Sequence, residues 1–93
     1  MKTVYRYEIN QAINDVNLPV GAKVLSVGVA ENGISSNVVS LWALVDTEAG
    51  TETRKFLVFG TGADMSATET YNLEFVGTIQ KSNAYAFHIF EVK

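Results

Sequence analysis

The sequence predicts a single small domain that is all-β or a β-rich α+β fold, with about six mostly antiparallel strands in a twisted sheet or barrel-like sandwich. Three observations predict this class. Short apolar runs follow one another along the 93 residues, several of them alternate with polar residues, and short polar turns separate them. No internal repeat, low-complexity tract or linker divides the chain, so we expect one domain over residues 1–93.

The N-terminal third predicts two strands with a loop between them. Residues 3–9 place aromatic and aliphatic side chains at alternate positions, which is the period of a half-buried strand. Residues 10–17 are polar with weak helical spacing, and we expect a loop or a short turn there. At residues 18–21 a proline fixes φ and a glycine tolerates positive φ, which predicts a turn. The second strand is expected over residues 23–30.

An Asn-Gly pair is the strongest local signal in the chain. Asn32-Gly33 suits the two positive-φ positions of a type I′ turn, so we expect a hairpin between the second strand and a third over residues 38–46. The third strand is apolar on both faces, and so is a fourth over residues 53–60. Because such strands are covered on both sides and only 18% of the residues are charged, we expect a homo-oligomer.

The C-terminal third predicts two further strands after a long connection. Residues 63–72 predict a loop or a short helix capped by Ser66. Residues 73–80 and 84–92 predict the last two strands, which a polar turn joins into a second hairpin. The predicted core gathers large residues of these strands: Tyr7, Leu25, Val27, Leu41, Ala43, Phe56, Val58, Phe75, Ile79, Phe87 and Ile89.

Composition and charge argue against several classes of partner. The net charge is −3 and the basic residues do not cluster, so we expect no binding to extended nucleic acid. The chain has no cysteine and no histidine or carboxylate spacing typical of metal ligands, so we expect neither a disulfide nor a metal or other cofactor. No apolar run approaches the length of a membrane span, which predicts a soluble, cytoplasmic protein with no membrane partner.

The sequence offers little catalytic chemistry. His88 is the only histidine, and a lone histidine on a strand is typical of packing or of a hydrogen-bond partner. A nucleophile needs a neighbouring base, and no nucleophile-elbow motif is present. The acidic residues lie mostly in turns and at strand ends, where they are solvated. We therefore expect a binding protein and not an enzyme.

One glycine-rich turn is a candidate small-molecule site. Gly60-Thr61-Gly62 lacks the fingerprints of phosphate-binding loops, and the simpler interpretation is a tight strand exit. The alternative is a backbone nest that holds an anion with help from Arg54. Trp42 is either a core anchor or a stacking or interface anchor. Trp42 and His88 could line the sides of such a ligand site. The candidate ligand-binding residues are therefore Arg54, Gly60, Thr61, Gly62, Trp42 and His88.

Several blocks of sequence, taken in order, resemble a family of small uncharacterised bacteriophage and prophage proteins. The blocks are MKTVYRYEI at 1–9, LPVGAKVLSV at 18–27, NG at 32–33, LWALVD at 41–46, FGTG at 59–62, FVGTI at 75–79 and FHIFE at 87–91. The chain departs from the family pattern by extra length between NG and LWA. It also has Ala63-Asp64 where the family has His-Pro, so no histidine role transfers to that position.

The resemblance implies a phage origin and brings no catalytic residues with it. A small phage protein of this kind is expected to act by binding a target molecule. The first expectation is a counter-defence inhibitor or accessory factor that binds a host protein. One alternative is an oligomeric sponge that sequesters a small nucleotide immune signal, and a second is a virion structural protein. An inhibitor needs an exposed apolar patch with a polar rim, whereas a sponge needs cations converging on phosphates.

Overall fold

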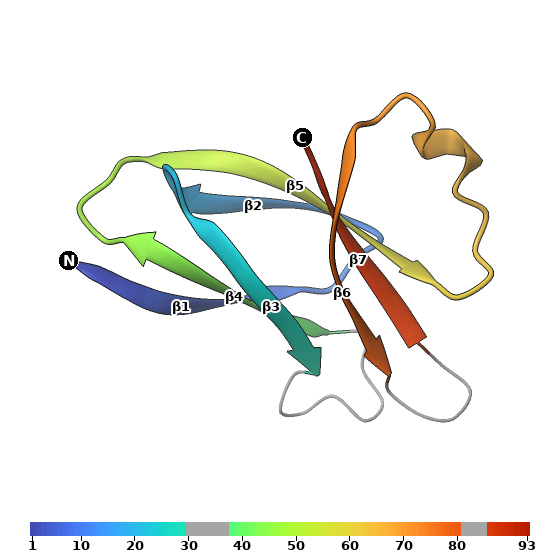
Figure 1. Cartoon of the computed structure of the whole chain (residues 1–93), viewed down its shortest axis with the longest axis horizontal. Helices are drawn as coiled ribbons and strands as arrows, with labels where there is room; N and C mark the ends of the chain where they lie inside the picture. The colour runs from blue at the N-terminus through green and yellow to red at the C-terminus, as the bar shows by residue number, and fades with distance from the viewer. Residues whose placement is uncertain (30–37, 81–85) are drawn as a thin grey trace.

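The computed structural model describes residues 1–29, 38–80 and 86–93, and this part of the chain is mostly strand with almost no helix. The elements are β1 (Lys2–Ile9), β2 (Ile13–Pro19), β3 (Lys23–Val29), β4 (Val39–Asp46), β5 (Thr51–Gly60), the 3₁₀ turn η1 (Ser66–Thr68), β6 (Leu73–Gln80) and β7 (Ala86–Val92). They form two antiparallel sheets of order β1-β4-β3 and β2-β5-β7-β6, which do not close into a barrel (Figure 1). The predicted β-rich class is confirmed.

The core lies between the inner faces of the two sheets. Its buried members come from six of the strands and from Ala22, the residue before β3. They are Ile9, Leu18, Ala22, Val39, Leu41, Ala43, Val45, Phe56, Ile79 and Ile89. The edge strands β3 and β6 also approach each other, so closely that a Cβ added at Gly77 would lie 2.8 Å from Val27 Cγ2. Tyr7, Val58 and Phe87 pack against this core, as the sequence predicts.

The loop predicted over residues 10–17 is wrong, because β2 occupies much of it and pairs with β5. The inward positions of β2 include Asn14 as well as Leu18, and the polar residue obscures the apolar alternation. Asn14 is satisfied locally: its Oδ1 accepts the N–H groups of Asn10 and Gln11 at 3.2 and 3.1 Å, and its Nδ2 donates to Gln11 O at 2.7 Å. A buried polar group is tolerated when it is hydrogen-bonded in this way.

The prediction of a core position is wrong for two residues, because Leu25 and Phe75 are 47% and 57% exposed. The register with β4 shifts between Val24 and Ser26, and the register of β6 with β7 shifts between Phe75 and Gly77. An extra residue in one strand reverses the alternation of faces beyond it. Period-two counting through either irregularity therefore assigns the wrong face.

The connections agree with the expected hairpins where they are described. β3 pairs with β4 and β6 pairs with β7, while the turns predicted at residues 32–33 and 81–83 lie outside the described residues. The predicted cap at Ser66 is wrong. Ser66 begins η1 and itself donates its N–H and hydroxyl to Asp64 Oδ1, at 2.9 and 2.6 Å. No helix in the described part of the chain is long and apolar enough to cross a membrane.

Candidate functional site

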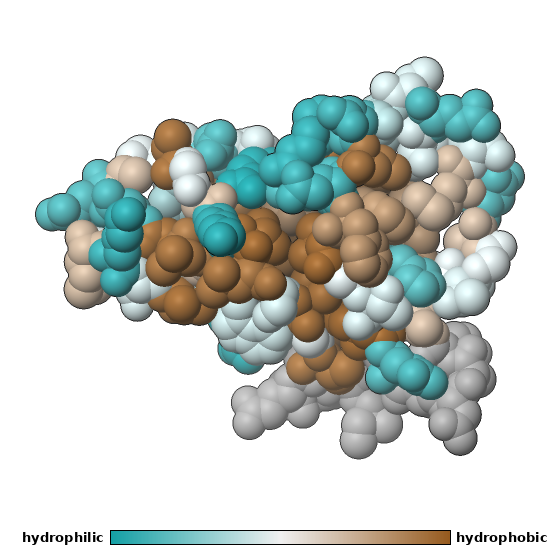
Figure 2. Space-filling model, in the orientation of Figure 1, coloured by the Kyte–Doolittle hydropathy of each residue, from teal (hydrophilic) through white to brown (hydrophobic). Residues whose placement is uncertain are grey.

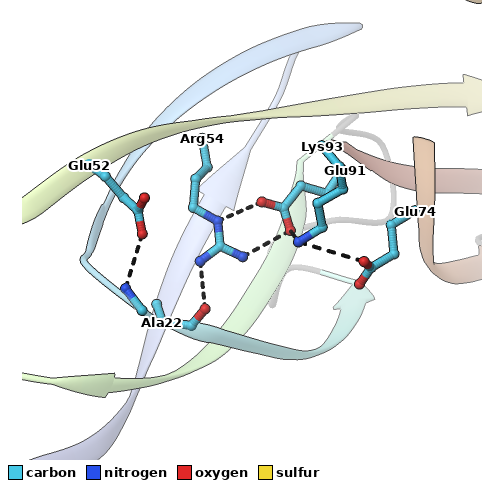
Figure 3. A network of polar contacts seen from close by, with 7 residues as sticks. Ala22, Glu52, Arg54, Glu74, Glu91 and Lys93 are labelled. Carbon is cyan, nitrogen blue, oxygen red and sulfur yellow. Dashed lines mark hydrogen bonds and ion pairs between the residues drawn. The ribbon is translucent and has the colours of Figure 1, made fainter. Parts of the chain in front are cut away.

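Arg54, the predicted anion-binding cation, is held in an ion pair on the inner face of the four-stranded sheet (Figure 3). Its Nε and Nη2 atoms donate to Glu91 Oε2 and Oε1 at 2.5 and 2.9 Å, and its Nη1 donates to Ala22 O at 2.5 Å. Lys93 Nζ lies 3.2 Å from the same Glu91 carboxylate and 3.6 Å from Glu74. Because three of its nitrogens are occupied, Arg54 works as a structural clamp between β5, β7 and the start of β3.

The charges in this cluster stabilise one another. Burial would raise the pKa of Glu91, but hydrogen bonds and positive charge from Arg54 and Lys93 outweigh burial and hold that pKa below its usual value. The hydrogen bonds to Glu91 raise the pKa of Arg54. A phosphate at Arg54 would have to displace a buried carboxylate, so the geometry gives a phosphate site here no support.

The Gly60-Thr61-Gly62 segment is a tight turn at the end of β5. Ala63 N–H donates to Gly60 O at 3.0 Å and Gly62 has a φ of +85°, which is the pattern of a type II turn. Thr61 N–H donates to Ala86 O at 3.1 Å. These two amide groups are already bonded within the chain and are not free to cradle an anion.

His88 lies on the outer face of the four-stranded sheet, between two threonines. Its Nε2 is 2.7 Å from Thr61 Oγ1 and its Nδ1 is 2.9 Å from Thr78 Oγ1. Each ring nitrogen therefore has a hydroxyl partner, which agrees with the interpretation of His88 as a hydrogen-bond partner. The structure thus brings two of the six predicted site residues, Thr61 and His88, into direct contact.

Gly60 and Gly62 flank Thr61 in the same turn, whereas the other two predicted residues, Arg54 and Trp42, lie apart from that contact. Arg54 is six residues from Gly60 along β5, or about 20 Å, and it faces the core. Trp42 belongs to β4, in the other sheet, and points outward from it. The six residues do not form one cavity. Among the described residues, no three histidine or carboxylate side chains are grouped as metal ligands.

Trp42 is the centre of a different surface, which we call the Trp42 face. It consists of the outward positions of the three-stranded sheet: Lys2, Val4, Arg6 and Glu8 on β1, Ser40, Trp42, Leu44 and Asp46 on β4, and Lys23, Ser26 and Gly28 on β3. The indole lies against Gly28, where an added Cβ would come within 2.8 Å of Trp42 Cζ3. Glycine at this position lets the indole ring approach the β3 backbone closely, and Trp42 remains half-buried.

The Trp42 face carries cations that lack acidic partners. Arg6 stands directly opposite Trp42, and Lys23 stands opposite Leu44. Within the described residues neither side chain forms an ion pair, whereas Arg54, Lys55 and Lys93 all do. Unpaired cations around an aromatic residue give this face a positive character on a chain whose net charge is −3.

Of the two acidic side chains of this face, Glu8 lies two residues from Arg6 without an ion pair among the described residues, and Asp46 is bonded elsewhere. Asp46 accepts the Glu48 N–H at 3.1 Å and lies 3.5 Å from the N-terminal amine. The Glu48 hydrogen bond is the main cause that lowers the pKa of Asp46, and the positive charge of the amine adds to it. Asp46 is therefore occupied at the far end of the sheet from Glu8.

A depression of about 260 Å³ opens at one end of the Trp42 face. Its lining combines aliphatic residues with two lysines: Lys2, Val20, Gly21, Lys23, Leu44, Val45 and Asp46. Figure 2 shows apolar residues gathered over β3 and β4, with hydrophilic residues around them. The exposed members on these strands include Leu25 and Leu44. An apolar centre, a hollow beside it and a charged rim together form a surface of the kind that binds proteins.

Sequence reasoning identified Trp42 but missed Arg6, Lys23 and Leu44. The alternation of residues 3–9 does place Arg6 on the face opposite Tyr5 and Tyr7. The missing information is the pairing of β1 and β3 with β4, which brings Arg6 and Lys23 to the same side of the sheet as the indole.

The comparisons with known proteins give a family but no activity. The chain matches, over residues 1–93, a family described as a domain of unknown function (DUF7352), and it belongs to that family. No curated protein and no solved structure matches it.

Proposed function

We propose that this member of a domain family of unknown function is a non-enzymatic binding protein whose Trp42 face docks on an acidic segment of another protein. The observation that supports it most directly is that Arg6 lies opposite the half-buried Trp42 and Lys23 lies opposite the neighbouring outward residue Leu44, both without an ion pair among the described residues. Tryptophan and arginine are the residues most enriched among those that dominate binding energy at protein interfaces.

The partner's chemistry follows from the face. A partner carboxylate beside Arg6 gains a charge-assisted hydrogen bond, since Arg6 forms no ion pair within the described residues. The depression beside Leu44 accepts an aliphatic side chain, and Lys2 and Lys23 at its rim attract a further acid. Positive charge on an acidic protein also steers the partner toward this face and away from the rest of the surface.

The more specific proposal is that the partner is a host protein and that this chain is a phage counter-defence inhibitor. It is supported by the resemblance of the sequence to small phage and prophage proteins and by the apolar patch with a charged rim. The nucleotide sponge has weaker support, because Arg54 is engaged by Glu91 and the amides of Thr61 and Ala63 are bonded within the chain. No contact in the described residues favours a virion role.

The test is capture from a bacterial host lysate with charge-reversed variants. Immobilised wild type is compared with Arg6→Glu/Lys23→Glu and with the matched control Lys55→Glu, which reverses an exposed cation of the other sheet. We expect a host protein that wild type and Lys55→Glu retain, that the double variant loses, and that rising salt concentration elutes.

Two outcomes contradict the proposal. One is a set of captured proteins that is the same for all three baits, which would make the two cations irrelevant. The other is a nucleotide-sized adduct on wild type, seen by native mass spectrometry without any captured protein, which would favour the sponge. Both reversed side chains are exposed, so circular dichroism is expected to show an unchanged fold in every variant.

A further inference from the structure

The outer face of the four-stranded sheet carries a second apolar surface, which we call the Phe90 face. Its centre is one row that crosses all four strands through direct cross-strand pairs: Ile13 on β2, Leu57 on β5, Phe90 on β7 and Phe75 on β6. Phe75 and Phe59 both meet the Phe90 ring edge to face, with centroids 5.5 and 6.3 Å apart. The two ends of the row, Ile13 and Phe75, are 56% and 57% exposed.

The polar groups around this row are satisfied within the chain. Asp15 and Lys55 pair with each other at 3.6 Å, and Thr53 donates to Asn17 at 2.8 Å. His88 is held by its two threonines. Among the described residues, this face therefore carries one acid and one base, which neutralise each other, in contrast to the Trp42 face with its unpaired cations. A neutral face with satisfied polar groups is buried at little cost against another of the same kind.

The row is also complementary to itself. Half of it is aliphatic and half aromatic, so a two-fold axis parallel to the strands places Ile13 of one copy against Phe75 of the second. Leu57, inside the row, is 1% exposed and is covered by its own chain, so the two ends of the row make the contact between copies. Each copy then supplies both halves, as an isologous interface requires. Two chains of charge −3 repel each other, and a neutral face is where that repulsion is weakest.

We propose that the Phe90 face is the interface of a homodimer of this chain, formed by packing two four-stranded sheets face to face. The occupant is a second copy because the face offers no net charge to attract an unlike partner. Ile13 and Phe75, the exposed ends of the row, provide the contact between the two copies. This assembly leaves the Trp42 face of each copy on the outside, so the dimer presents two docking surfaces.

The test is the solution mass of matched variants by size-exclusion chromatography with light scattering. Wild type is expected at twice the chain mass of 10.2 kDa. Ile13→Lys and Phe75→Glu, each placing a charge at an exposed end of the row, are expected at the single-chain mass. Val4→Lys, the matched control on the Trp42 face, is expected to remain a dimer.

Mixing the two monomeric variants tests the arrangement itself. In a mixed dimer the introduced lysine meets the introduced glutamate at one contact, while the other keeps the original Ile13 and Phe75 pair. The mixture is therefore expected to return to the dimer mass, with circular dichroism unchanged throughout. Wild type at the single-chain mass, dissociation by Val4→Lys, or a mixture that stays monomeric would each overturn the proposal.

Discussion

Arg54 and Glu91 form a two-pronged ion pair across β5 and β7, with side chains only 14% and 4% exposed. The third arm of the guanidinium reaches Ala22 O, at the start of β3 in the other sheet. The pair therefore links the four-stranded sheet to the segment that leads into β3 of the three-stranded sheet. Its energetic role and its pH dependence can be measured separately.

Arg54→Met removes one partner and leaves the Glu91 carboxylate buried. We expect a loss of about 3–5 kcal/mol in the free energy of unfolding, measured by urea denaturation. In Arg54→Met only Lys93 remains beside the buried Glu91 carboxylate. The double variant Arg54→Met/Glu91→Leu is expected to lie closer to wild type, because it removes that buried carboxylate as well. Lys55→Met, which breaks the exposed pair with Asp15, is the control and is expected to cost under about 1 kcal/mol. Equal losses for Arg54→Met and Lys55→Met would show that burial of the pair has no energetic consequence.

The titration of Glu91 gives the stability a predictable pH dependence. Since the folded pKa of Glu91 lies below its ordinary value of 4.5, folding favours the charged form. That contribution is complete above the ordinary pKa and is lost as the pH falls through the folded pKa. We expect the unfolding free energy of Glu91→Gln to change less than that of wild type between about pH 6 and about pH 3. Parallel curves for the two proteins would contradict the lowered pKa.

Gly28→Ala tests the contact under the indole of Trp42. An alanine Cβ would come within 2.8 Å of the ring, so the indole has to move. We expect a loss of about 1–3 kcal/mol in unfolding free energy and a shift in tryptophan fluorescence, which reports Trp42 alone because the chain has one tryptophan. Gly50→Ala is the matched control, since no atom lies within 4 Å of its added Cβ. An unshifted emission maximum in Gly28→Ala would contradict the packing.

The turn after β5 gives a prediction about backbone conformation. Gly62 has a φ of +85° with open space around its Cα, so Gly62→Ala strains the backbone without a clash. We expect a cost of about 1–2 kcal/mol in unfolding free energy. Gly60→Ala, two residues away, meets only Ala86 O at 4.0 Å and has no positive φ, so it serves as the control. The same loss in both variants would argue against the type II turn.

Much of the fold could be predicted because alternation and apolar runs mark β1 and β4 to β7 directly. β2 was hidden because Asn14 takes an inward position and is satisfied by hydrogen bonds that the sequence does not show. Leu25 and Phe75 were assigned to the wrong face because each lies at a shift in strand register. Such a shift depends on the partner strand and leaves no local pattern.

The candidate site was harder to predict than the fold. The sequence alone presents Arg54 as a free cation, because its partner Glu91 lies 37 residues away, on a strand that is not adjacent in the sequence. Trp42 was found by residue type, but its neighbours Arg6 and Lys23 come from two other strands. Cross-strand register creates the surface, and a single sequence does not specify that register.

The most direct measurement of the central claim is fluorine NMR of the protein labelled with fluorotryptophan, titrated with the host protein captured by wild type. Trp42 is the only labelled position, so its resonance reports the proposed docking face without interference. We expect the resonance to shift or broaden in proportion to bound partner, and to stay unchanged in Arg6→Glu/Lys23→Glu at the same partner concentration. A resonance that is unaffected when wild type is saturated with partner would contradict docking at the Trp42 face.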